Sequence, residues 1–382
     1  MFETSSSEFF LGEIPFIVRP LTEPTNSSFN LPDKIGFTLN IDPETGVIRQ
    51  GSNKKLAVDL SRAYLLGAEM SGMMEAHNIG AEYAQDFLNY VTTSNTLSGK
   101  SVLEIGCGTG YLLSEFSRHG AITLGVEPGA HGLEGSKSHS VQIIRDFYPN
   151  KSITETFDFI VLYCVLEHIE DVTNFLTSLH LNLRKNGKVL IAVPNCQKYL
   201  ENGDPSCFIH QHWSYFTQIS LKRELARAGF DSSQKFSEFG GLIYSEAWIP
   251  DSKLHDRESP KPIYDLQSSI TNSLEKLSLM ISDATPESPF GIYPGIRGVN
   301  AIALLKVNSE SIRLYDDSPH IIGTYYPGFD YPVKSSKSIS SDNLSAIWIS
   351  SDSFQMRLLE NILAQGYTGK IITWDDVFVN SV

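Results

Sequence analysis

The stretch EIGCGTG, residues 104–110, holds three glycines between an apolar run and a helix-like segment. Glycine adopts backbone conformations closed to other residues, so the stretch predicts a tight turn where main chain lies close to a ligand. Between a strand and a helix, backbone N–H groups and the helix N-terminus can approach a nucleotide-type ligand. We therefore expect a ligand site at Gly106, Gly108 and Gly110.

The spacing of these glycines argues against two common nucleotide motifs. A dinucleotide fingerprint reads GxGxxG, whereas the third glycine here follows the second by two residues. A phosphate loop needs GxxxxGK followed by Ser or Thr, and no such lysine follows. NAD and ATP are therefore disfavoured.

A second group of reactive side chains lies in HQHWSYFT, residues 210–217, which contains two histidines, Trp213 and Tyr215. Histidine suits proton removal because its unperturbed pKa is near 6.5. His212 is the candidate base. A histidine that only packs and forms hydrogen bonds is the alternative, and for His210 it is the stronger one.

These residues need a sheet to position them, and the sequence predicts one. Apolar runs alternate with helix-like segments, which is typical of a parallel sheet covered on both faces. The segments, in order, are KSVLEIG, GYLLSEFSRHG, AITLGVEP, VQIIRDF, FDFIVLYCV, the helix DVTNFLTSLHLNLRKNG, KVLIAVPN and the helix that ends at Gly229. FGGLIYSEAW could add antiparallel strands at the edge. The prediction is a doubly wound α/β domain.

The flanking segments complete the predicted organisation. Residues 1–60 are expected to form an arm with a hairpin in GFTLNIDPETGVIRQGS, and residues 61–248 the doubly wound domain. Residues 249–288 read as a linker and one connecting helix, and residues 289–382 as a smaller C-terminal α/β domain.

Composition limits the function. The chain of 382 residues carries 44 acidic and 30 basic residues, for a formal charge of -14, which disfavours nucleic acid and anionic membranes as partners. Its four cysteines form no CxxC pair, so neither a disulfide framework nor a metal site is predicted. No apolar stretch reaches about 18 residues, and no signal peptide is evident, so a cytoplasmic protein is expected.

With its surroundings, EIGCGTG resembles the first motif of class I S-adenosylmethionine-dependent methyltransferases. Glu127 in LGVEP, Asp146 in IIRDF and the stretch FDFIVLYCVLEHIEDV resemble the motifs that follow. The resemblance implies S-adenosylmethionine as cofactor. Glu127 would accept hydrogen bonds from both ribose hydroxyls, because a carboxylate has two acceptor oxygens.

The resemblance also implies further cofactor residues. Asp146 would accept from the adenine amino group with Phe147 beside the ring, and Glu104 would lie near the methionine amino group. Pro128, Cys107 and Cys164 would line the cofactor site, and the cysteines are expected to pack rather than act as nucleophiles. Glu167 and His168 are interpreted as pocket wall and helix start rather than as acid or base.

The acceptor is suggested by a second resemblance, over roughly residues 61–382, to nucleotide-sugar C-methyltransferases that act on 4-keto deoxysugars. Their EHxxYFS motif lies over residues 211–217, QHWSYFT, so His212 carries over as the base, and Gln211 replaces the family's glutamate. A family tyrosine corresponds to Tyr64. The run of Gly323, Pro327, Gly328, Pro332 and Val333 matches the C-terminal part of that family.

This second resemblance implies removal of a C3 proton by His212, assisted by Tyr64 and Tyr215, and attack of the enolate carbon on the methyl group. Substrate contacts are expected from His210, Gln211, Trp213 and Arg297, with a nucleotide-linked sugar as partner. The family's N-terminal zinc-binding cysteines are missing here. Methylation of an oxygen or nitrogen on a sugar, antibiotic or other metabolite is therefore the alternative, and a non-catalytic scaffold is a third possibility.

Overall fold

The computed structural model describes residues 8–16, 21–25, 30–51, 53–65, 78–129, 132, 137, 139–251 and 266–379. The chain divides into two compact units, each built from separate segments. The central unit comprises Ile41–Cys196 and His212–Pro262, and the terminal unit comprises Met1–Asn40, Gln197–Gln211 and Ile263–Val382. The domain boundaries near 60, 248 and 288 stay predictions.

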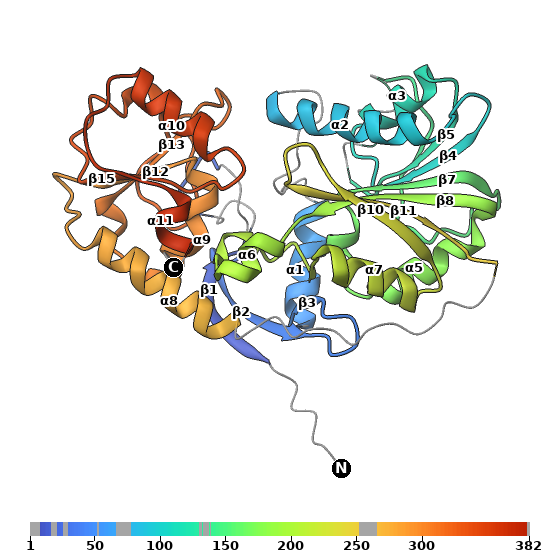
Figure 1. Ribbon diagram of the computed structural model, residues 1–382, viewed down its shortest axis with the longest axis horizontal. Coiled ribbons are helices and arrows are strands. Elements are labelled where there is room, and N and C mark those ends of the chain that lie inside the picture. The colour runs from blue at the N-terminus through green and yellow to red at the C-terminus, as the bar shows by residue number, and fades with distance from the viewer. Residues whose placement is uncertain are drawn as a thin grey trace, which may run out of the picture. The chain divides into compact units, whose positions relative to one another are not determined.

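The central unit contains a seven-stranded sheet in the order β10-β11-β8-β7-β4-β5-β6 (Figure 1). Strands β4 to β8 run parallel, and β10 and β11 form an antiparallel edge. The strands are β4 Ser101–Ile105, β5 Ile122–Val126, β6 Ile143–Ile144, β7 Phe157–Tyr163, β8 Leu183–Pro194, β10 Asp231–Phe236 and β11 Leu242–Trp248. The predicted parallel α/β sheet with an antiparallel edge is confirmed.

Helices cover both faces of this sheet. They are α2 Asn78–Ser94, α3 Tyr111–Arg118, α5 Val172–Ser178 and α7 Gln218–Arg227, and α1 Lys54–Leu65 is a further helix of the central unit. Helices α2 and α3 contact each other on one face, and α5 and α7 contact each other on the opposite face (Figure 1). Strand β7, FDFIVLY, is buried along almost its whole length, as expected for a strand covered on both sides.

One predicted helix is too long. The sequence predicts a helix over 171–187, but α5 ends at Ser178, a 3-10 turn covers Leu179–Leu181, and Leu183 already begins β8. The Asn182 carbonyl accepts the N–H of Phe157 at 2.8 Å, and Leu183 pairs with Phe157. Pairing with β7 therefore overrides the local helical preference of this segment.

Two short strands of the central unit lie next to His212, the predicted base, in the structure. Strand β3, Ile48–Gln50, pairs antiparallel with β9, Ser214–Tyr215. The turn predicted in DPETG precedes β3, where the Asp42 carboxylate accepts the N–H groups of Glu44 and Thr45, both at 3.0 Å.

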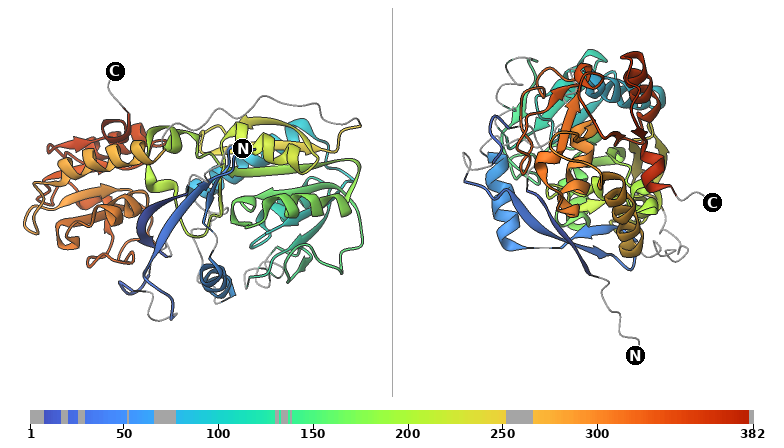
Figure 2. Two further views of the ribbon diagram at one scale, coloured as in Figure 1. Left: turned by 90° about the horizontal axis from the view of Figure 1, so that it is seen from below. Right: turned by 90° about the vertical axis from the view of Figure 1, so that its left-hand side faces the viewer.

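The terminal unit has a five-stranded parallel sheet in the order β14-β13-β12-β15-β16. Its strands are β12 Phe290–Tyr293, β13 Ile312–Asp316, β14 Lys334–Ser335, β15 Ala346–Ile349 and β16 Ile371–Ile372. Its helices are α6 Gln197–Asn202, α8 Leu266–Ile281, α9 Gly295–Leu305, α10 Gln355–Ala364 and α11 Trp374–Phe378. Figure 2 shows the α8 to α11 region, orange to red, from two further directions.

The N-terminal strands β1 Phe9–Pro15 and β2 Lys34–Ile41 form an antiparallel pair, and β1 packs on α9. The predicted connecting helix is α8. Among the helices in the described part of the chain, none has the length and hydropathy needed to cross a membrane.

Candidate functional site

The glycine turn follows β4 and leads directly into α3. Gly106, Gly108 and Gly110 have φ values of 71°, 50° and 75°, a region that favours glycine. A Cβ on Gly106 would lie 2.5 Å from Cγ2 of Val165, in the loop after β7. A Cβ on Gly108 would meet nothing within 4 Å. The turn therefore packs tightly against the β7 loop at one glycine and is open at the next.

Glu127 lies beside this turn, at the end of β5. One of its carboxylate oxygens accepts the Gly108 N–H at 3.0 Å, and the other accepts the Gly129 N–H at 2.7 Å. The carboxylate is therefore fixed next to the open side of the turn. This arrangement fits a ligand with hydroxyl donors, such as the ribose of S-adenosylmethionine.

The other residues expected at the cofactor lie along the same edge of the sheet. Asp146 is exposed after β6, and its carboxylate accepts the N–H of the half-exposed Phe147 at 2.8 Å. Glu104 is buried within β4. The remaining expected residues are the partly buried Pro128 after β5, the buried Cys107 in the glycine turn, and Cys164 after β7 with a φ of 54°.

Glu167, His168 and His212 form a cluster at the end of β7. Glu167 and His168 lie on the 3-10 turn Leu166–His168, and His212 precedes β9. Donor atoms of all three side chains lie within 4.8 Å of one another, and the two imidazole rings meet edge to face at 4.8 Å between centroids. The structure thus brings His212 together with two residues that the sequence suggests only as pocket wall.

Glu167 is an unusual carboxyl group because it is almost fully buried. Its exposed fraction is 1%. Burial raises the pKa of Glu167 to about 8, since desolvation disfavours the charged form. Its Oε2 atom has no hydrogen-bond partner among the residues that the structure describes.

The main chain around this cluster is held by three hydrogen bonds. The Trp213 N–H donates to the Glu167 carbonyl at 2.7 Å. The His212 carbonyl accepts from Gln50 Nε2 at 3.2 Å and from the Tyr215 hydroxyl at 3.0 Å. The predicted catalytic residue Tyr215 is fully buried, and its hydroxyl is oriented toward the His212 carbonyl.

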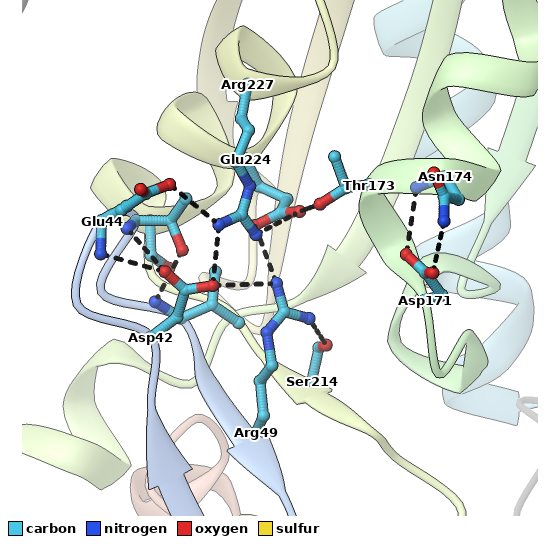
Figure 3. Close-up of polar contacts among 12 residues, drawn as sticks. Asp42, Glu44, Arg49, Asp171, Thr173, Asn174, Ser214, Glu224 and Arg227 are labelled. Atoms are coloured by element: carbon cyan, nitrogen blue, oxygen red, sulfur yellow. Dashed lines mark hydrogen bonds and ion pairs between the residues drawn. The ribbon is translucent and has the colours of Figure 1, made fainter. Parts of the chain in front are cut away.

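A network of charged side chains anchors β9 to its surroundings (Figure 3). The fully buried Glu224 carboxylate, on α7, accepts from Arg49 at 2.8 Å, from Arg227 at 2.7 Å and from the Thr173 hydroxyl at 2.5 Å. Arg49 also donates to the Ser214 hydroxyl at 3.0 Å. Strands β3 and β9 are thereby tied to α5 and α7.

Asp42 belongs to the same network. Burial alone would raise the pKa of Asp42, but hydrogen bonds from the Thr45 N–H and from Arg227 hold it below its ordinary value. An open hollow beside the network is lined by Arg49, Glu170, Asp171, Val172, Thr173 and Arg227. Because both arginines already pair with carboxylates, this hollow is a poor anion site.

The remaining predicted residues lie elsewhere or outside the described side chains. His210 is fully buried in the terminal unit, where its ring lies 5.0 Å from that of Phe37 and its Nε2 faces the Ile35 carbonyl at 3.2 Å. Gln211 is buried and Arg297 is exposed on α9, both in the terminal unit. The backbone of Tyr64 lies in α1, and its side chain is outside the described part.

Sequence reasoning missed the supporting residues Arg49, Gln50 and Glu224. No local pattern marks them, since Arg49 and Glu224 are 175 residues apart. The proximity of Glu167 and His212, in contrast, could have been predicted from the sequence. Polar residues that follow a parallel strand gather at the carboxyl edge of the sheet.

Comparisons with known proteins show similarity to methyltransferases. Residues 76–235 match a family described as a methyltransferase domain. The ubiquinone biosynthesis O-methyltransferase of Nitrobacter winogradskyi is 28% identical over 172 residues, which are 40% of this chain and 62% of that protein. The mitochondrial protein of the same name from Schizosaccharomyces pombe is 31% identical over 117 residues, 28% of this chain and 43% of that protein.

Two solved structures are similar in fold to part of this chain. The DhpI-SAM-HEP complex has a TM-score of 0.40 at 17% identity and covers 52% of this chain and 100% of that one. The glycopeptide N-methyltransferase MtfA with S-adenosylmethionine has a TM-score of 0.37 at 16% identity and covers 44% of this chain and 94% of that one.

This chain spans less than two thirds of the length of the curated relatives named above. The matched segment contains the glycine turn, Glu127 and the residues that follow β6 and β7. Residues 76–235, which include the glycine turn at the edge of the parallel sheet, are therefore similar to a methyltransferase domain.

Proposed function

We propose that the protein transfers the methyl group of S-adenosylmethionine to a small-molecule acceptor that binds beside Glu167, His168 and His212. The supporting observation is the contact between the two halves of the site. Strands β4 and β7 are parallel neighbours, and the glycine turn after β4 packs on Val165, two residues before Glu167. A ligand at the turn would therefore lie near the cluster.

In this proposal the cofactor residues have the roles that the family resemblance implies. Glu127 accepts hydrogen bonds from the ribose hydroxyls, Asp146 accepts from the adenine amino group beside Phe147, and Glu104 lies toward the methionine end. When bound, S-adenosylmethionine supplies an electrophilic methyl carbon on a sulfonium. The glycine turn and the Glu127 carboxylate, which the Gly108 and Gly129 N–H groups fix in place, orient it.

The acceptor must lose a proton before or during the transfer. His212 is the side chain that we assign to this proton, with Tyr215 fixing the position of the His212 carbonyl. The lone pair of the acceptor atom then forms the bond to the methyl carbon as the carbon–sulfur bond breaks. The electrons of that bond stay on sulfur, which becomes a neutral thioether.

An oxygen acceptor is favoured by the curated relatives, which are named O-methyltransferases. These relatives match 40% and 28% of this chain, so they support the reaction more than the substrate. In this version of the proposal, the acceptor is a hydroxyl group of a small metabolite.

Carbon methylation of a nucleotide-linked 4-keto deoxysugar is the second candidate. It is favoured by the run from Gly323 to Val333 in the terminal unit, outside residues 76–235, which match the methyltransferase domain. Gly323 and Gly328 have φ values of 84° and 86°, and the Gly323 N–H donates to the Val333 carbonyl at 2.8 Å. The hydrogen bond closes the run into a loop. Its two glycines occupy the positions with left-handed backbone.

The test combines ligand binding with product analysis. S-adenosylhomocysteine should raise the melting temperature, because it binds only the folded state. Addition of a nucleoside diphosphate should raise it further only if a nucleotide-linked sugar is the acceptor. Mass spectrometry after incubation with methyl-labelled cofactor then compares phenols and other hydroxyl compounds with keto sugars. Absence of any shift with S-adenosylhomocysteine would refute the proposal.

A further inference from the structure

The cluster of Glu167, His168 and His212 has the composition of a metal site. It combines one carboxylate with two imidazoles, and its donor atoms lie within 4.8 Å of one another. Two histidines and a glutamate are a known ligand set for catalytic zinc, with the fourth position open to water or substrate. In a tetrahedral site with bonds of about 2.1 Å, ligand atoms are about 3.4 Å apart, so small side-chain rotations would complete the geometry.

Glu167 provides an independent indication that this cluster binds a ligand. The side chain is 1% exposed, and Oε2 has no hydrogen-bond partner among the described residues. A buried carboxyl oxygen without a partner is costly. A cation at the cluster would satisfy this oxygen and would compensate the burial of the carboxylate.

The scaffold of the cluster is rigid enough to hold a metal. The backbones of Glu167 and Trp213 are joined by a hydrogen bond of 2.7 Å, so the 3-10 turn and the loop before β9 are fixed to each other. Gln50 and Tyr215 both donate to the His212 carbonyl. Side chains from two distant segments are thus held in place by main-chain contacts, as preorganised ligands require.

We propose that Glu167, His168 and His212 bind one divalent transition metal ion of the zinc type, with an open coordination position that the methyl acceptor occupies. The choice of metal follows from the ligands, because imidazole suits zinc, cobalt and related ions, whereas magnesium prefers oxygen ligands. This proposal deepens the proposed function. The role of the metal in methyl transfer rests on that proposed function. The binding of a metal ion by the three side chains does not depend on the proposed function.

The metal would change how the acceptor loses its proton. Coordination lowers the pKa of a bound hydroxyl group, as it does for metal-bound water. The acceptor oxygen then releases its proton to solvent, and its lone pair forms the new bond to the methyl carbon while the carbon–sulfur electrons remain on sulfur. In the metal-bound protein, His212 acts as a ligand and the proton is not transferred to it.

The test is a titration of the metal-free full chain with Co²⁺, followed by visible absorption, and then displacement of Co²⁺ by Zn²⁺ or Mg²⁺. We expect one Co²⁺ per chain, displacement by Zn²⁺ and none by equimolar Mg²⁺. Glu167→Gln and His212→Asn should each weaken Co²⁺ binding at least 10-fold. His119→Ala is the matched control, because His119 is an exposed histidine at the end of α3, outside the cluster.

Melting curves without metal check that each variant folds, and His168→Asn replaces any variant that does not. X-ray absorption of the wild-type metal complex requires no variant and should report two imidazoles and a carboxylate oxygen. The proposal is overturned if binding is not stoichiometric, if cluster variants bind like His119→Ala, or if the absorption data lack imidazole ligands.

The same samples separate this proposal from the proposed function. A melting shift with S-adenosylhomocysteine but no metal binding would overturn the metal site alone. Stoichiometric metal binding without methyl transfer to any acceptor would overturn the proposed function alone.

Discussion

Replacement of Glu224 by alanine should destabilise the central unit strongly. The Glu224 carboxylate is fully buried and accepts hydrogen bonds from Arg49, Arg227 and Thr173 (Figure 3). Its removal leaves two guanidinium groups without their shared buried partner. Both guanidiniums keep contact with Asp42, at 3.5 Å from Arg49 and 2.9 Å from Arg227.

The size of the effect follows from the burial of the partners. Removal of one member of a buried ion pair costs about 3–5 kcal/mol. The side chains of Arg49 and Arg227 are 21% and 28% exposed, so water and Asp42 compensate part of the loss. We therefore expect the lower end, about 3 kcal/mol. For a unit of this size, that corresponds to a drop in melting temperature of roughly 6–12 °C.

The assay is thermal unfolding followed by circular dichroism, with Glu44→Ala as the control. Glu44 also faces Arg227, at 3.5 Å, but its side chain is 77% exposed. Exposed ion pairs contribute little, so this variant should melt within about 2 °C of wild type. If the two variants were equally stable, the assignment of the network as a buried anchor would be wrong.

Glu224→Ala has a second expected effect, on the proposed reaction. Arg49 on β3 pairs with Ser214 on β9 and donates a hydrogen bond to its hydroxyl. Ser214 lies two residues after His212. Loss of the anchor should therefore reduce the rate of methyl transfer more than the affinity for S-adenosylhomocysteine. A variant that loses cofactor affinity and rate in equal proportion would contradict this role.

Three further predictions concern the cofactor site and the terminal unit. Gly106→Ala should weaken S-adenosylhomocysteine binding in calorimetry, because the new Cβ would lie 2.5 Å from Val165. The control is Gly99→Ala, which should bind normally, because Gly99 has a similar φ of 74° but no atom within 4 Å of the new Cβ. Equal affinities of the two variants would contradict the packing argument. Glu127→Ala should weaken the same ligand by roughly 10- to 100-fold, since it removes charge-assisted hydrogen bonds, and unchanged affinity would exclude its ribose role. Asp204 is buried in the terminal unit, where its carboxylate accepts the Trp374 indole N–H at 2.6 Å. Burial raises the pKa of Asp204 to about 6, so the folded state retains a proton that the unfolded chain loses between about pH 4 and 6. The unfolding free energy should therefore fall by about 3 kcal/mol as pH rises through that window, and Asp204→Asn should not show this component; identical pH profiles of the two proteins would refute it.

Local patterns in the sequence were sufficient for the framework of the central unit. The apolar run FDFIVLY predicts a buried strand because a strand covered on both faces needs apolar residues at successive positions. The glycines of EIGCGTG predict left-handed backbone, and all three adopt it. Short-range sterics and hydrophobic periodicity decide these features, so neighbouring residues carry the information.

The sequence was less informative where a neighbouring strand competes with local preference. Residues 183–187 look helical, yet they belong to β8, which pairs with β7 at Leu183 and again from Lys188 onward. The same limit applies to the division of the chain, in which Gln197–Gln211 groups with segments from both ends. Such groupings depend on which distant surfaces pack together.

The sequence alone determined a glycine turn at a strand end, acids after the next two strands, and a histidine-containing segment further along the chain. Only the tertiary structure brought Glu167, His168 and His212 to one point and buried Glu224 between Arg49 and Arg227. The physical reason is that hydrogen bonding, ion pairing and metal coordination act over a few ångströms in space. The parallel sheet brings its strand ends to one edge whatever their separation along the chain, and no local pattern records which side chains meet there.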